Sequence, residues 1–329
     1  MAIGKASDFK IYHEEFFGGY VEVLQQNADA FNGASANAIR LIPDRMRGDY
    51  EKESFIKSIS ALATRRDTTS VAAATDTALT QGEIVGVKLN RRIGPVANTF
   101  DSFKKIEQDP QALSFLLGQQ IGQAVSLEMI NTTLACLDAA LSGVAGLTTD
   151  ASALTTPNGP NLTHTNLVTA MSKLGDRSNR LVAWVMHSKP YFDLVKNAIA
   201  DKVFEVAGVT IYSGNVATFG RPVVVIDSAN LFDATPVPDT YTTLGLVQDA
   251  AIINESEGRD IVSDVVTGLD NLVIRMQGEY AYNLKLKGFA WDVTNGGANP
   301  SDAALATATN WDKAATDDKD LPGVRLLVA

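Results

Sequence analysis

The chain has very few of the residues on which most site chemistry depends. Its 329 residues include one cysteine, Cys136, and three histidines, His13, His164 and His187. A lone cysteine excludes an internal disulfide, and three scattered histidines do not make a zinc set. The sequence also lacks the glycine-rich phosphate and dinucleotide loops and the zinc-protease and serine-hydrolase motifs. We therefore expect no catalytic site, no metal site and no cofactor.

Positive charge is scarce as well. The chain holds 28 Lys and Arg against 38 Asp and Glu, which gives a net charge of −10. Proteins that wrap nucleic acid need a basic excess to neutralise phosphates, so this balance argues against such binding. The charge is also uneven, because residues 40–66 hold seven basic and four acidic residues whereas 176–270 hold seven basic and thirteen acidic ones. The two regions therefore differ in electrostatic character.

Long apolar runs are missing too. The N-terminal residues MAIGKASDFK lack the apolar core of a secretory signal. The most apolar stretch, Asp109 to Gly143, contains Glu128, Asp138 and several glutamines. It therefore lacks the run of about twenty apolar residues that a membrane span requires. We expect no contact with a membrane.

This stretch instead has the pattern of one long helix. Asp109 can cap its N-terminus, Pro110 suits the first helical position, and Gly143 ends it. Apolar residues recur every three or four positions, which predicts one buried face. They are Leu113, Leu117, Ile121, Ala124, Leu127, Ile130, Leu134, Leu137 and Leu141. The other face is polar but uncharged, so we expect either a well-covered core helix or a helix whose second face packs against another element or subunit.

The region before the helix is predicted to be an arm followed by a hairpin. The first 40 residues are rich in aromatics with little periodicity, so something must cover the rings. Short helices are predicted at residues 20–31 and 55–62. Residues 67–96 have a β pattern, with a strand at 68–71, a turn at 80–83 and a strand at 85–89.

The predicted hairpin has a thin apolar face and several basic residues. A two-stranded ribbon of this kind is only marginally stable by itself. We therefore expect the hairpin to lie over a neighbouring subunit, where its basic side chains would meet acidic surface. These predicted inter-subunit contacts are Arg65, Arg66, Lys88, Arg91 and Arg92.

A linker rich in Thr, Ala, Gly and Pro at residues 148–161 separates the long helix from an alternating α/β region. Helices are predicted at 165–174 and 190–199, and strands at 181–187, 209–212, 222–226, 244–248, 251–253, 271–293 and 324–328. The long run at 271–293 is expected to return to the long helix. We divide the chain into an N-terminal arm (1–63), a hairpin (64–98), the long-helix region (99–150), an α/β sub-domain (151–265), a return strand (266–295) and a C-terminal segment (296–329).

These pieces, in this order, resemble the major capsid protein of tailed bacteriophages with the α+β Hong Kong 97 fold. Several stretches resemble one subfamily of phage major capsid proteins. They are GGYVEVLQQNADAFN, RMRGDYEKESF, TRRDTTS, GVKLNRRIGP and NWDKAATDDKDLPGVRLLVA. In that family the pieces are the N-arm, the extended E-loop, the peripheral P-domain with its spine helix, and the α/β A-domain.

The resemblance implies a structural protein and not an enzyme. It would assemble with itself through hexamers and pentamers into the icosahedral head shell, which encloses double-stranded DNA without sequence-specific binding. The implied location is the virion capsid, assembled in the cytoplasm of the bacterial host, with portal and decoration proteins as further partners. A built-in scaffolding stretch is not recognisable, so a separate scaffolding protein is expected. Two alternatives stay open: an encapsulin-type nanocompartment shell protein, and an α/β enzyme built on residues 163–253.

Overall fold

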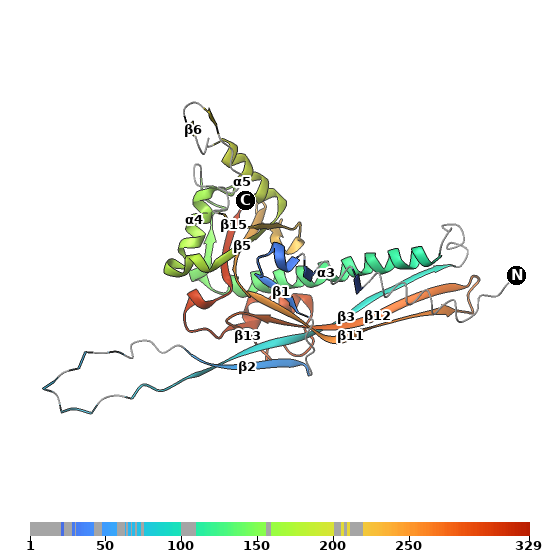
Figure 1. The fold of residues 1–329 in the computed structure, drawn as a ribbon, viewed down its shortest axis with the longest axis horizontal. Helices are drawn as coiled ribbons and strands as arrows, with labels where there is room; N and C mark the ends of the chain where they lie inside the picture. The colour runs from blue at the N-terminus through green and yellow to red at the C-terminus, as the bar shows by residue number, and fades with distance from the viewer. Residues whose placement is uncertain are drawn as a thin grey trace.

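A computed structural model of the chain describes a subset of its residues. They are 21–22, 28–29, 31–42, 48–57, 63, 65–66, 68–69, 71–73, 76–99, 110–155, 159–200, 205–206, 209–210 and 220–329. These residues form an α+β fold in which one long helix, α3 (Pro110–Ser142), lies against two sheets (Figure 1).

The first sheet has five strands in the order β1-β11-β12-β3-β2. Their bounds are Ile39–Ile42 for β1, Tyr50–Ile56 for β2, Gln81–Thr99 for β3, Ala251–Val266 for β11 and Val273–Leu286 for β12. β1 pairs with only the first four residues of β11, and β2 pairs with only the first seven residues of β3. Within the described residues, the far halves of β3, β11 and β12 therefore form a three-stranded ribbon, which runs along α3 (Figure 1).

The second sheet has the order β4-β15-β10-β5-β8, and β9 pairs with β10. The bounds are Thr148–Asp150 for β4, Leu181–Met186 for β5, Val223–Val225 for β8, Phe232–Asp233 for β9, Thr240–Val247 for β10 and Gly323–Val328 for β15. Two helices accompany this sheet, α4 (His164–Ser172) and α5 (Ser188–Ala200). The predicted alternation of helices and strands in this region is confirmed.

The remaining elements are short. They are β6 (Glu205–Val206), β7 (Val209–Thr210), β13 (Phe289–Trp291), β14 (Trp311–Lys313), α6 (Asp302–Leu305) and the 3-10 turns η1 (Ala145–Leu147), η2 (Gly175–Arg180), η3 (Ala229–Leu231), η4 (Ala308–Asn310) and η5 (Asp318–Asp320). One continuous hydrophobic cluster, which includes Leu134, Trp184 and Tyr282, joins the helix to both sheets.

Several predicted boundaries are wrong because sheet membership depends on pairing between distant segments. β11 was placed in the α/β sub-domain, yet it pairs with β12 in the first sheet. Residues 148–150, predicted as linker, form a strand parallel to β15, so the C-terminal segment completes the second sheet. The predicted run at 271–293 ends at Leu286, after which β13 begins a separate pairing with β14.

The predicted hairpin is also shifted along the chain. Its first strand is β2, whose last two residues, Phe55 and Ile56, lie in the helix predicted over 55–62. Residues 58–62 lie outside the described residues. β2 is charged, but Lys285 of β12 forms ion pairs with Glu51 and Glu53, which stabilises the extended chain. The predicted turn at 80–83 is the start of β3, so the connection between the strands is residues 57–80. This hairpin points away from the rest of the molecule (Figure 1).

The long helix is confirmed, and of the predicted buried face Ile121, Ile130, Leu134, Leu137 and Leu141 are buried, whereas two members are not. The side chains at positions 113 and 117 lie outside what the structure describes. Leu127 was expected in the core, yet it is 53% exposed, and Ala124 is exposed as well. The predicted series follows a period near 3.5 residues, which drifts by about 20° per heptad around a straight helix. The buried face also includes Val125, Met129 and Thr133, which were not predicted. By length and composition Gly118–Ser142 could cross a membrane, but 61% of that window is buried, as in the core helix of a soluble protein.

The position of the buried face can be tested by a pair of small truncations. Ile130→Val removes one buried methyl group and should cost about 0.5–1.5 kcal/mol of unfolding free energy. Leu127→Ala removes exposed atoms and should stay within about 0.5 kcal/mol. Urea unfolding of both variants measures the difference, and a larger loss for Leu127→Ala would contradict the assignment.

Candidate assembly surface

A polar junction fastens the middle of α3 to the first sheet. The hydroxyl of Tyr280 donates to Oε2 of Glu128 at 2.7 Å, and the hydroxyl of Tyr282 donates to Oε1 at 3.2 Å. Nε of Arg91 lies 2.9 Å from Oε1 of Glu128, and Nη2 of Arg91 lies 2.6 Å from Oδ1 of Asp302 on α6. The junction therefore connects the long helix, the first sheet and the C-terminal segment.

The protonation states of this junction follow from its burial. Burial raises the pKa of Tyr282, and the charge of Glu128 raises it further, so the tyrosine remains a neutral donor. Burial by itself lowers the pKa of Arg91. Its interactions with Tyr282, Glu128 and Asp302 have a larger, opposite effect, so the pKa is raised overall. The arginine therefore stays a cation that balances the carboxylates around it.

Two of the five predicted contact residues form ion pairs within their own subunit. Arg91 belongs to the junction, with its side chain 19% exposed, and Lys88 forms an ion pair with Glu257 of β11. Both side chains have partners in their own subunit, and their contact with acidic surface on a neighbour stays a prediction. Beyond Val87, β3 pairs with β12 and no longer with β2, and these two side chains reach Glu257 of β11 and Glu128 of α3.

The other three predicted contacts are exposed. Arg65 and Arg66 lie in the 57–80 connection, and Arg92 projects from β3 in the register opposite Glu279. Every described residue from 63 to 80 is exposed, including the apolar Val71 and Leu79. Contact of these three arginines with another subunit stays a prediction.

A second junction was missed by the sequence analysis. Nε of Arg325 on β15 donates to Oδ1 of Asp138 on α3 at 2.5 Å, and both side chains are mostly buried. It fastens the end of the long helix to the second sheet. Two features of the sequence could have indicated this pair. Asp138 is an acidic residue placed among apolar ones in the helix, and Arg325 is the one charged residue in the apolar run VRLLV.

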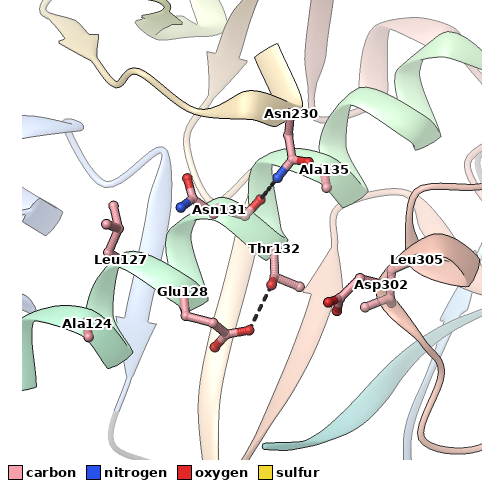
Figure 2. A pocket seen from close by; sticks show the side chains of 9 residues that line it. All are labelled: Ala124, Leu127, Glu128, Asn131, Thr132, Ala135, Asn230, Asp302 and Leu305. Atoms are coloured by element: carbon pink, nitrogen blue, oxygen red, sulfur yellow. Dashed lines mark hydrogen bonds between the residues drawn. The ribbon is translucent and has the colours of Figure 1, made fainter. Parts of the chain in front are cut away.

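A groove of about 400 Å³ opens on the exposed side of α3. Figure 2 shows Ala124, Leu127 and Asn131 of α3 along it, with Asn230 of η3 at one end and Asp302 of α6 at the other. Nδ2 of Asn230 donates to the backbone oxygen of Asn131 at 2.9 Å. The groove thus lies between the long helix, η3 and α6.

The strand-end histidine has a structural explanation. Nδ1 of His187 lies 3.4 Å from Oδ1 of Asp227 and 3.4 Å from Oγ of Ser188, so one nitrogen faces both groups and cannot relay a proton between them. Oδ1 of Asp227 accepts the backbone N–H of Ser188 at the start of α5, and hydrogen bonds from Ser188 lower the pKa of this aspartate. In the part of the chain that the structure describes, no group of three His, Cys, Asp or Glu could hold a metal.

Comparison with known proteins identifies related folds. The family model described as Gp13-like, major capsid protein 13-like, matches residues 8–325. A solved structure from Microbacterium phage Oxtober96 aligns with a TM-score of 0.54 and 12% identity, covering 90% of each chain. One from Mycobacterium phage Adephagia gives 0.52 and 11%, covering 90% of this chain and 89% of that one.

A third solved structure, a Cyanophage Pam1 capsid asymmetric unit, aligns with a TM-score of 0.51 and 10% identity, covering 88% of each chain. At these identities the alignments show a shared fold. No curated protein sequence matches.

Proposed function

The chain belongs to the Gp13-like family of major capsid proteins, and from this premise we propose how its copies join. The protein is a structural head-shell protein with the α+β fold of phage major capsid proteins. We propose that the 57–80 connection is the E-loop and that it lies over a neighbouring subunit, with Arg65, Arg66 and Arg92 meeting acidic surface there. The first sheet and α3 would be the P-domain, and the second sheet the A-domain.

One observation carries this proposal. All described residues of 63–80 are exposed although Val71 and Leu79 are apolar. An extended segment whose apolar side chains face solvent gains little stability from its own subunit, whereas burial against another copy would be favourable. Exposed ion pairs contribute only about 0–1 kcal/mol each, so the arginines would mainly select the register, and repetition around the shell would supply strength.

The wider assembly is proposed on the same premise. Copies would form hexamers and pentamers of an icosahedral head around double-stranded DNA, assembled in the host cytoplasm with scaffolding, portal and decoration proteins. The net charge of −10 favours this arrangement, because a shell that bound DNA tightly would hinder its packaging and release. The family assignment gives no support to the nanocompartment alternative or to an enzyme.

Limited proteolysis tests the proposed role of the loop. Trypsin should cut after Arg65 or Arg66 quickly in free subunits, because both residues are exposed, and much more slowly in sedimenting particles. Cleavage after Arg91 should be slow in both states, because β3 is paired with β12 there. Mass spectrometry of timed digests measures the three rates. Equal cleavage at Arg65 and Arg66 in both fractions would refute the contact, and failure to form any particle would refute the proposed function itself.

A further inference from the structure

The hairpin formed by β2 and the first seven residues of β3 leaves the first sheet at Val87. Leu284 of β12 is the last residue of that strand paired with β3, at Val87, and Tyr50 of β2 pairs with Val87 from the other side. From Gly86 back to Gln81, β3 is paired with β2 alone in the described part of the chain. A two-stranded hairpin is only marginally stable by itself. Its direction therefore depends on side-chain contacts with the rest of the subunit.

The face of the hairpin toward α3 provides an apolar anchor at its base. Val85 and Val87 are buried in the hydrophobic cluster, and Tyr50 packs against that cluster. Ser54 and Ile56, which follow on the same face of β2, are exposed. Apolar contact is non-directional, so this anchor holds the base of the hairpin but does not select one angle.

The face opposite α3 carries a polar clamp at the same level. Tyr282 of β12 turns toward α3, so Asn283 and Lys285 turn to the opposite face. Nζ of Lys285 forms ion pairs with Glu51 and, at 3.3 Å, with Glu53 of β2. Nδ2 of Asn283 donates to Oε2 of Glu51. These four side chains, the polar clamp, join β12 to β2, two strands that are not neighbours in the sheet.

Gly86 of β3 makes this crossing possible. It is the residue paired with Glu51, and it lies between the two strands that the clamp joins. A Cβ atom at position 86 would lie 2.6 Å from Cγ of Lys285 and 3.0 Å from Nδ2 of Asn283. The side chains of β12 therefore pass directly over the glycine to reach β2, and any larger residue would displace them.

The clamp is shielded from solvent and fully charged. Asn283 is buried, and the side chains of Lys285 and Glu51 are 13% and 28% exposed. Burial by itself lowers the pKa of Lys285. Its interactions with Glu51 and Glu53 have a larger, opposite effect, so the pKa is raised overall and the ammonium group stays charged. Hydrogen bonds to charged groups are strong and directional, so the clamp can select an angle where the apolar anchor cannot.

We propose that Lys285 and Asn283 are positioning residues, which fix the direction of the β2–β3 hairpin by holding Glu51 across Gly86. The clamp is a property of the free subunit. Its consequence for assembly rests on the proposed function: a hairpin that already points in one direction has less freedom to lose when it meets another subunit. Assembly then begins at a lower subunit concentration.

Distances between two spin labels in the free subunit test the clamp directly. The labels are attached at Gln81→Cys on the hairpin and Val168→Cys on α4, two exposed positions, while the native Cys136 is buried and escapes labelling. The intact clamp should give one narrow distance distribution in pulsed electron resonance. Lys285→Met removes the ammonium group and keeps most of the apolar stem, so the single narrow peak should be lost.

Two further variants separate the clamp from a general loss of charge. Lys52→Met removes the ion pair with Glu83 inside the hairpin, so the narrow peak should remain. Gly86→Ala keeps every charge but places a methyl group where the side chains cross, so the peak should be lost. A narrow peak in either Lys285→Met or Gly86→Ala would overturn the clamp and leave the assembly proposal intact. Loss of the peak in Lys52→Met would overturn it as well.

Assembly of the same variants tests the positioning role. The concentration of folded subunit at which sedimenting particles appear should rise by about tenfold for Lys285→Met and stay unchanged for Lys52→Met. If Lys285→Met does not fold, Glu51→Gln breaks the same ion pair from the side of β2. A lost peak with an unchanged threshold would overturn the positioning role. Absence of particles from the unmodified chain would refute the proposed function, whereas the distance measurement would still decide the clamp.

Discussion

Replacing Gly323 by alanine should prevent the second sheet from closing, so that little soluble folded protein is recovered. Gly323 is paired with Leu246 between β15 and β10. A Cβ atom at position 323 would lie 2.0 Å from the backbone oxygen of Gly245 and 3.1 Å from Cα of Leu246. Backbone atoms of two paired strands cannot move apart without losing the pairing, so we expect a loss of more than about 4 kcal/mol.

A matched glycine provides the control for this variant. Gly33 lies in a helical stretch, and a Cβ atom there would meet nothing within 4 Å. Gly33→Ala should therefore be neutral or slightly stabilising, because alanine favours helix. Soluble yield and thermal unfolding of the two variants give the comparison, and similar melting temperatures would show that β10 and β15 are not in such close contact.

Replacing Arg91 by methionine should destabilise the subunit by about 2–3 kcal/mol. The change keeps much of the apolar stem of the side chain but leaves Glu128 and Asp302 without their shared cation. Breaking a buried pair costs about 3–5 kcal/mol, and the partial exposure of Glu128 reduces that figure. Urea unfolding of Arg91→Met measures the loss.

Two further variants isolate the charge contribution at this junction. Arg92→Met changes the adjacent exposed arginine of the same strand and should stay within about 0.5 kcal/mol. Adding Glu128→Gln to Arg91→Met should recover part of the loss, because the unpaired carboxylate is removed. Equal unfolding midpoints for the Arg91 and Arg92 variants would mean that the junction does not hold the helix to the sheet.

The helices and strands that were predicted most accurately are those with a clear local sequence pattern. α3 begins at the predicted Pro110 and ends at Ser142, next to the predicted Gly143, so the helix was found almost to the residue; the predicted cap, Asp109, lies outside the described residues. α4, α5 and the strands β5, β8, β10 and β15 were found because apolar and helical patterns alternate there, whereas β4 and β9 were not. The family resemblance, carried by several stretches along the chain, is confirmed by the family match.

What the sequence could not show depends on contacts between distant segments. β2 was not predicted because its charged residues give no strand pattern and its partners, Gly86 of β3 and Lys285 of β12, lie far along the chain. Arg91 looked like a surface residue because nothing nearby in the sequence shows that α3 and α6 place Glu128 and Asp302 beside it. The alternating pair Tyr280 and Tyr282, together with Glu128 on the helix, was the signal that could have located this junction.

The three-stranded ribbon of β3, β11 and β12 has a mechanical consequence. β11 and β12 pair from Ala251 opposite Leu286 to Val266 opposite Val273, and β12 continues this pairing onto β3. Backbone hydrogen bonds lie across the strands, so a pull along the ribbon loads the whole ladder in shear and many bonds must yield together. A sideways pull at β1 or β2 instead peels a short ladder one bond at a time. The subunit should therefore resist a pull along its ribbon better than a sideways pull at its edges, which suits a shell wall that is loaded in its own plane.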